Sequence, residues 1–200
     1  MKLLSHTSLG RIGVALLALT TSMAQAHTGH DTSGVLQGLA HPLGLDHLLV
    51  MLAVGVWSVS ALPAGKSWWG PAVFMLTLLL SSALGSVGLA VPFLEPMISL
   101  SVVLLGLMLV LSRSGTPVPL GLGLVALVAS LHGLAHGAET PGTGFAMYAL
   151  GFLVSTAALH GCGLLAARGI GRYLARSAAW AISVLGTLCG AAGLYLLSQF

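Results

Sequence analysis

The sequence predicts an all-α integral membrane protein in which a cleaved signal peptide is followed by a six-helix transmembrane bundle. Hydrophobic residues make up 56% of the 200 residues and charged residues only 6%, whereas a soluble domain carries about 25% charged residues. The apolar runs are continuous and do not alternate with polar residues, which favours helices over a membrane β-barrel. This length gives room for one bundle without a separate soluble domain.

The first 26 residues have the features of a signal peptide. Lys2 and Arg11 precede a short apolar run, and residues 24–26, Ala-Gln-Ala, form a small-x-small cleavage pattern. We expect cleavage there, so that the mature chain begins at His27; an uncleaved anchor helix is the alternative. The predicted division is a signal peptide over 1–26, a periplasmic leader containing histidine over 27–40 and a six-span transmembrane domain over 41–200.

Six apolar segments of the mature chain are long enough to cross a membrane as helices. Proline, glycine and arginine residues separate these segments and mark the loops. The predicted spans cover about residues 43–62, 69–90, 95–112, 118–138, 143–167 and 174–197.

The charged residues outside the spans predict how the chain crosses the membrane. With the mature N-terminus in the periplasm, every loop predicted to be cytoplasmic carries lysine or arginine, and the periplasmic loops carry only acids. The cytoplasmic set is Lys66, Arg113, Arg168, Arg172 and Arg176, and the periplasmic set is Asp31, Glu95 and Glu139. This is the positive-inside pattern of a bacterial inner-membrane protein. Because the basic residues follow this topological pattern, the net charge of +3 does not indicate nucleic-acid binding.

A first polar group lies at the start of the first predicted span. Pro42 suits the first turn of a helix, so His41 stands at or just before that turn, and Asp46 and His47 follow about one turn inside. An acidic residue costs about 2.5–3.5 kcal/mol near the centre of a span and less near its end. A carboxylate at a helix N-terminus also complements the helix dipole, so part of the reason for Asp46 can be structural.

A second polar group ends the fourth predicted span. His132, His136 and Glu139 are four and three residues apart, so a helix places them on one face. Glu95, at the start of the third span, lies at the same predicted outer level. Imidazole and carboxylate ligands without a thiolate suit nickel, cobalt, zinc or copper(II) more than magnesium or calcium.

We predict that the two polar groups meet near the outer surface and hold a divalent transition-metal ion. The alternative is a polar network that only packs helices together. The candidate metal-binding residues are His41, Asp46, His47, Glu95, His132, His136 and Glu139.

Three further histidines are candidates for an accessory role. His160 lies in the inner half of the fifth span, where it either continues a row of ligands inward or bonds to another helix. His27, with the α-amino group freed by cleavage, and His30 either capture metal at the entrance or belong to a flexible polar leader. Cys162 and Cys189 are predicted at different depths, so we expect no disulfide between them.

The chain resembles the HupE/UreJ family of membrane nickel permeases over nearly its whole length. The resemblance rests on the signal peptide and on three motifs. These are the leader His27-Thr28-Gly29-His30-Asp31, the first-span motif His41-Pro42-Leu43-Gly44-Leu45-Asp46-His47 and the fourth-span motif Leu131-His132-Gly133-Leu134-Ala135-His136-Gly137-Ala138-Glu139. One feature departs from the family pattern: four residues separate His41 from Asp46 where the family has five. Four is the spacing in the separate nickel/cobalt transporter family. The shortening turns His41 by about 100° relative to Asp46 on a helix, which leaves the role of His41 open.

The resemblance implies uptake of Ni²⁺ from the periplasm into the cytoplasm, where nickel chaperones or enzymes such as hydrogenase or urease would receive it. It implies a transporter and not an enzyme, with no permanently bound cofactor, and it is compatible with a homo-oligomer in the lipid bilayer. The positions that it implies as functional are His41, Asp46, His47, Glu95, His136 and Glu139. The alternatives are a permease for Co²⁺ or another divalent metal, a membrane haem-binding protein with paired histidines, and a membrane metal sensor that binds without transporting.

Overall fold

The computed structural model describes residues 34–112, 115–140 and 144–200, and within these ranges it contains helices and no strands. The elements in chain order are α2 (Gly34–Ala40), the 3-10 turn η1 (His41–Leu43), α3 (Leu45–Ala61), α4 (Trp69–Ser86), α5 (Leu94–Val110), α6 (Val118–Ala138), α7 (Phe145–Tyr173) and α8 (Ala178–Leu197). The predicted signal peptide and the leader histidines His27 and His30 lie outside the described residues.

Four of the described helices, α4, α6, α7 and α8, are long and apolar enough to cross a membrane. A fifth crossing is formed if α2 with η1 and α3 count together, although the pair is bent by 73° at Gly44. Helix α5 is apolar but has 17 residues, a length of about 26 Å against the roughly 30 Å of a bilayer core. The chain is thus a helical, multi-pass membrane protein.

The observed helices differ from the predicted spans mainly at their ends. Helix α6 covers Val118–Ala138, the bounds predicted for the fourth span. Residues 34–40, which the sequence places in the leader, form helix α2 and pack on α7. Helix α7, the fifth predicted span, continues to Tyr173, beyond the predicted end at 167. Arg168 and Arg172 lie one turn apart on an exposed face of this helix, so they reach water without a loop.

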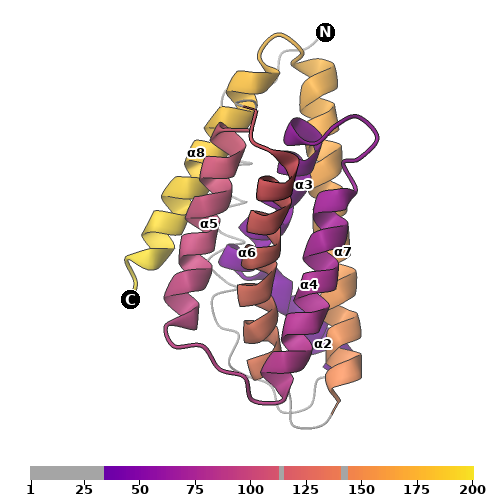
Figure 1. Ribbon diagram of the computed structural model, residues 1–200, viewed down its shortest axis with the longest axis vertical. Coiled ribbons are helices and arrows are strands. Elements are labelled where there is room, and N and C mark those ends of the chain that lie inside the picture. Colours follow the sequence, from indigo (N-terminus) through magenta and orange to yellow (C-terminus); the bar gives the residue numbers. More distant parts are fainter. Residues whose placement is uncertain (1–33, 113–114, 141–143) are drawn as a thin grey trace, which may run out of the picture.

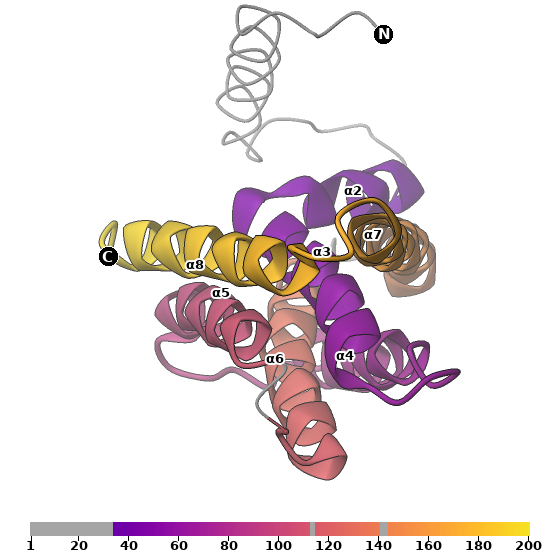
Figure 2. The same cartoon turned by 90° about the horizontal axis from the view of Figure 1, so that it is seen from above.

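The helices associate as close pairs, α4 with α6, α5 with α8, and α3 and α2 with α7 (Figures 1 and 2). Glycines make these approaches close, as expected in membranes, where small residues let backbones touch. A Cβ added at Gly106 would lie 2.5 Å from the Gly190 nitrogen of α8, and one at Gly85 would lie 2.6 Å from the Leu134 carbonyl of α6.

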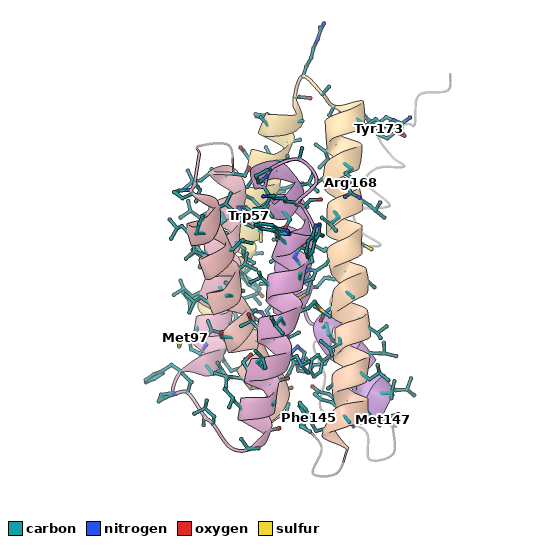
Figure 3. The ribbon with its side chains drawn as sticks, turned by 45° about the vertical axis from the view of Figure 1, so that its right-hand side comes forward. Trp57, Met97, Phe145, Met147, Arg168 and Tyr173 are labelled. Atoms are coloured by element: carbon teal, nitrogen blue, oxygen red, sulfur yellow. The ribbon has the colours of Figure 1, made fainter. Side chains whose placement is uncertain are left out.

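The two ends of the bundle carry different residues. Figure 3 shows Arg168 and Tyr173 at one end and Phe145 and Met147 at the other. Arg168 donates a hydrogen bond to the Ser67 hydroxyl at 3.3 Å, which brings the loop between α3 and α4 to the arginine end. Both cysteines are free, Cys162 exposed and Cys189 buried; the sequence predicts only that they form no disulfide with each other.

Candidate metal site

A break in the chain before α3 positions the first histidine. Residues His41–Leu43 form one 3-10 turn with Pro42 in its first positions, and Gly44 then leaves helical geometry with ψ of 144°. The helix axis bends here by 73°. Because His41 is not on α3 itself, the helical-wheel argument that separated it from Asp46 does not apply, and the turn carries its ring back over the start of α3.

Three histidines from η1, α3 and α6 form a compact cluster. One ring nitrogen each of His41, His47 and His136 lies within 4.8 Å of the other two. The ring centroids of His41 and His136 are 4.3 Å apart, and those of His47 and His136 are 5.0 Å apart. His136 is fully buried and His47 is 6% exposed. The structure therefore brings together the first and fourth predicted spans at these histidines.

Two carboxylates hold two of the three rings. Nδ1 of His47 is 2.9 Å from the Asp46 carboxylate, and Nδ1 of His41 is 3.0 Å from that of Glu139. A carboxylate only accepts, so each Nδ1 carries the hydrogen and each Nε2 presents its lone pair. This is the arrangement in which an outer carboxylate orients a metal-binding imidazole. The sequence predicts Asp46 and Glu139 as metal ligands. In the structure their carboxylates contact the imidazole rings of His47 and His41.

The Glu139 carboxylate lies just outside helix α6 and is half-exposed. Partial burial raises the pKa of its carboxyl group, but the hydrogen bond from the His41 ring, together with the neighbouring imidazoles, outweighs this effect and holds the pKa below its ordinary value. The carboxylate therefore stays negative beside the cluster.

Aromatic residues of α7 pack against the cluster, on a side where the sequence predicts no site residue. The Phe152 ring stacks on His136 at 4.5 Å and 23°, and Tyr148 lies 6.2 Å from His41. Both are buried. The four-residue spacing of Tyr148, Phe152, Thr156 and His160 on one apolar helix was the signal that could have found them.

The remaining predicted residues lie around or below this cluster. His132 is one turn deeper on α6, fully buried, with its ring 4.6 Å from that of His47. His160 on α7 is buried further inward beside Phe74, with ring centroids 4.9 Å apart. Glu95 is exposed in the first turn of α5 and does not belong to the cluster of His41, His47 and His136.

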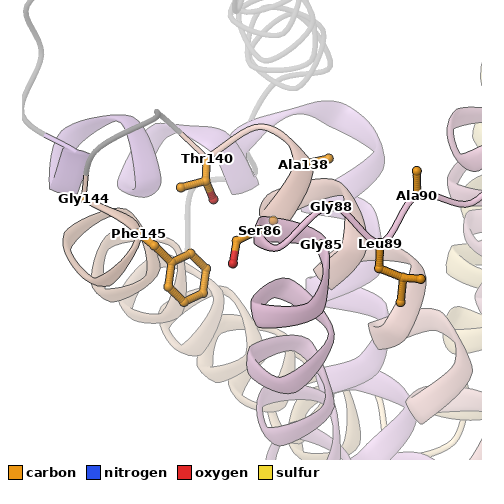
Figure 4. A pocket seen from close by; sticks show the side chains of 10 residues that line it. Gly85, Ser86, Gly88, Leu89, Ala90, Ala138, Thr140, Gly144 and Phe145 are labelled. Atoms are coloured by element: carbon orange, nitrogen blue, oxygen red, sulfur yellow. The ribbon is translucent and has the colours of Figure 1, made fainter.

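An open hollow of about 490 Å³ lies beside the cluster, at the ends of α4 and α6 and the start of α7 (Figure 4). Its lining residues are Gly85, Ser86, Gly88, Leu89, Ala90, Gly137, Ala138, Thr140, Gly144 and Phe145. None of these residues is an imidazole or a carboxylate, so the hollow is not itself the metal site.

The cluster suits a divalent transition-metal ion. The Nε2 atoms of His41 and His47 and both ring nitrogens of His136 are buried without a hydrogen-bond partner among the described residues, a state that is costly for polar atoms in an apolar interior. Imidazole nitrogens bind such metals at about 2.1 Å, so two ligands of one ion are at most about 4.2 Å apart. The observed spread of up to 4.8 Å is close to this and requires only a small inward movement.

Comparison with known proteins finds relatives along nearly the whole chain. The family model described as "HupE / UreJ protein" matches residues 14–196. The chain is 40% identical over 179 residues to "Protein HupE" of Rhizobium leguminosarum bv. viciae, an alignment that covers 86% of this chain and 92% of that protein. No solved structure matches the chain. On this evidence the chain belongs to the HupE/UreJ family.

Proposed function

We propose that this protein is a permease that takes up Ni²⁺ from the periplasm into the cytoplasm. The observation that carries the proposal is the cluster of His41, His47 and His136. Four of its ring nitrogens are buried and have no hydrogen-bond partner in the part of the chain that the structure describes. The family resemblance favours nickel, and nickel is among the metals that imidazole ligands suit.

The cluster would capture the ion and remove part of its water shell. Asp46 and Glu139 fix the rings of His47 and His41, and their negative charges offset part of the cost of bringing a dication toward a low-dielectric interior. The described cluster has no thiolate ligand, so it should hold the ion loosely enough for release, as conduction requires. A membrane potential negative inside would favour entry by about 4.6 kcal/mol per 100 mV for two charges.

The proposed topology has six spans, with α5 as the short third span, and a periplasmic N-terminus after removal of the signal peptide. The cluster then lies at the periplasmic end, and Lys66, Arg168, Arg172 and Arg176 lie at the cytoplasmic end. Released metal would go to nickel chaperones or to enzymes such as hydrogenase or urease.

The geometry of the cluster argues against a haem site. A bis-histidine haem needs room for a planar macrocycle between two imidazoles. The rings of His41, His47 and His136 instead contact one another, with centroids 4.3–5.0 Å apart, which leaves no such room.

The test is uptake of radioactive nickel by cells that express the protein, with an excess of unlabelled Co²⁺ in a parallel sample. His136→Ala should abolish uptake, whereas Ser86→Ala, an exposed hydroxyl at the same end of the bundle, should transport normally. Wild-type uptake by His136→Ala would refute the proposal. Equal competition by Co²⁺ would show that the site accepts both metals, and binding without accumulation in reconstituted vesicles would identify a sensor.

A further inference from the structure

Helix α7 carries a buried row of side chains that runs inward from the cluster. Tyr148, Phe152, Thr156 and His160 are each four residues apart, and all four are buried. Residues at this spacing share one face of a helix. The row begins where Phe152 stacks on His136 and reaches His160 after eight more residues, about 12 Å further along the axis.

His160, at the inner end of this row, is oriented by one ring nitrogen and offers the other to a metal ion. It is 1% exposed, and its Nδ1 lies 2.8 Å from the Met51 carbonyl oxygen of α3. A carbonyl only accepts, so Nδ1 carries the hydrogen and Nε2 presents a lone pair. That Nε2 is buried with no partner among the described residues.

Thr156, one turn closer to the cluster on the same face, provides a second and independent observation. Several hydroxyl groups on the other helices bond back to a carbonyl of the preceding turn, for example Ser58 to Val54 and Ser130 to Ala126. The Thr156 hydroxyl is fully buried and has no partner within the described chain. Two adjacent polar groups with unused bonding capacity in an apolar interior call for an explanation.

His132 lies between the cluster and this position. Its Nδ1 is 3.0 Å from the Val128 carbonyl oxygen, so its Nε2 also presents a lone pair, and this atom too is buried without a partner in the described ranges. Its ring is 4.6 Å from His47 on the outer side and 6.2 Å from Phe74. Phe74 in turn contacts His160.

We propose that His160 Nε2 and the Thr156 hydroxyl form a second, inner binding station for the transported divalent metal ion, which reaches it by way of His132. This inference rests on the proposed function. The station is built from neutral donors only, with no carboxylate on either residue, so it should bind more weakly than the outer cluster. A weaker inner station lets an ion move on, as conduction requires.

The competing explanation is that His160 only ties α7 to α3 through Met51. Two substitutions separate the explanations. In His160→Asn, the side-chain amide can still donate to the Met51 carbonyl from the position of Nδ1, but nothing replaces Nε2. Thr156→Val keeps the shape of the side chain and removes only the hydroxyl.

The first measurement is equilibrium dialysis of the purified full chain in detergent with Ni²⁺ alone. In a His136→Ala background, which disables the outer cluster, a weaker class of bound nickel should remain. Adding His160→Asn should lower the affinity of this class at least about tenfold, the scale of losing a group that supports a metal site. If no nickel remains, or if the remaining nickel is insensitive to His160→Asn, the inner station is refuted.

The second measurement is nickel uptake with the outer cluster intact. His160→Asn and Thr156→Val should each slow uptake while the affinity of the outer cluster stays unchanged. Wild-type rates in both would overturn the inner station without touching the outer cluster. If the wild-type protein binds nickel in dialysis but accumulates none in uptake, the proposed function is overturned. The effect of His160→Asn on nickel binding in dialysis then still decides whether the inner station exists.

Discussion

The carboxylate oxygens nearest the cluster bond to imidazole Nδ1 atoms, at 2.9 Å for Asp46 and 3.0 Å for Glu139. At the scale of single residues, this arrangement separates two tasks. The histidines offer nitrogens to the ion, and the carboxylates fix the hydrogen on the far side of each ring. Asp46 also accepts the backbone N–H of His47 at 2.8 Å, so one carboxylate oxygen holds both the backbone and the ring of its neighbour.

Asp46→Asn should weaken nickel binding by about 10–100-fold, the usual loss when an orienting partner of a metal-binding histidine is changed. The neutral amide is a poorer acceptor for Nδ1–H, and its NH₂ group can favour the wrong tautomer of His47. Isothermal titration of the purified protein with Ni²⁺ measures this loss. Ser86→Ala is the control, and an unchanged affinity in Asp46→Asn would show that the carboxylate has no orienting role.

His41→Ala should weaken nickel binding as much as His136→Ala does. The sequence leaves the role of His41 open because of the short spacing to Asp46, whereas the structure places a nitrogen of His41 within 4.8 Å of the other two histidines. The same titration on both single variants decides the question. If His41→Ala binds nickel like the wild type while His136→Ala does not, the site has only two of the three proposed histidines.

At the scale of helices, the sequence was most informative where one physical signal dominated. The apolar run bounded by Pro117 and the His136 motif predicted α6 with its observed bounds. The bend at Gly44 was not predictable, because a glycine in an apolar segment does not by itself indicate a break. Gly44 also has a negative φ of −55°, which other residues adopt, so the bend does not require a glycine. A continuous helix through this turn would rotate His41 away from Asp46, whereas the observed break returns it to the cluster.

Close contact between α3 and α7 predicts different outcomes for two nearby glycines. A Cβ at Gly163 would press on the Leu52 carbonyl oxygen and lie 3.0 Å from Gly55 Cα, whereas a Cβ at Gly161 meets nothing within 4 Å. Gly163→Ala should therefore destabilise the fold by about 1–3 kcal/mol, the usual cost of overpacking. Gly161→Ala should be neutral or stabilising, since alanine favours helices by about 1 kcal/mol over glycine.

Thermal unfolding of both variants in detergent measures this difference, with Gly161→Ala as the matched control on the same helix. Because Met51 and His160 join α3 and α7 near this contact, Gly163→Ala should also reduce nickel uptake. Equal Tm values for the two variants would show that the helices separate without cost and that the close approach is not required.

At the scale of the whole molecule, the sequence predicted which residues share a depth but not which of them touch. Periodicity and the positive-inside pattern placed six candidate residues at one level. They could not show that Glu139 bonds to His41, nor that Glu95 stays exposed on α5, because these depend on how the helices are arranged around one another. The aromatic wall from α7 was missed for the same reason: Phe152 is an ordinary apolar residue until its ring is seen to stack on His136.

The distribution of charge predicts which end of the molecule faces the cytoplasm. Arg168 bonds to Ser67, so the loop carrying Lys66 shares an end with the α7 arginines, and lysine and arginine are retained on the cytoplasmic side. In a variant with Cys162 and Cys189 replaced by alanine, Val87→Cys should react with a membrane-impermeant maleimide in spheroplasts. Ala64→Cys should react only after the membrane is opened. Val87 is 81% exposed and Ala64 is also exposed, and both lie in connections outside the helices, so failure to react does not come from burial within the protein. The reverse pattern would place the histidine cluster on the cytoplasmic side and change the proposed direction from uptake to export.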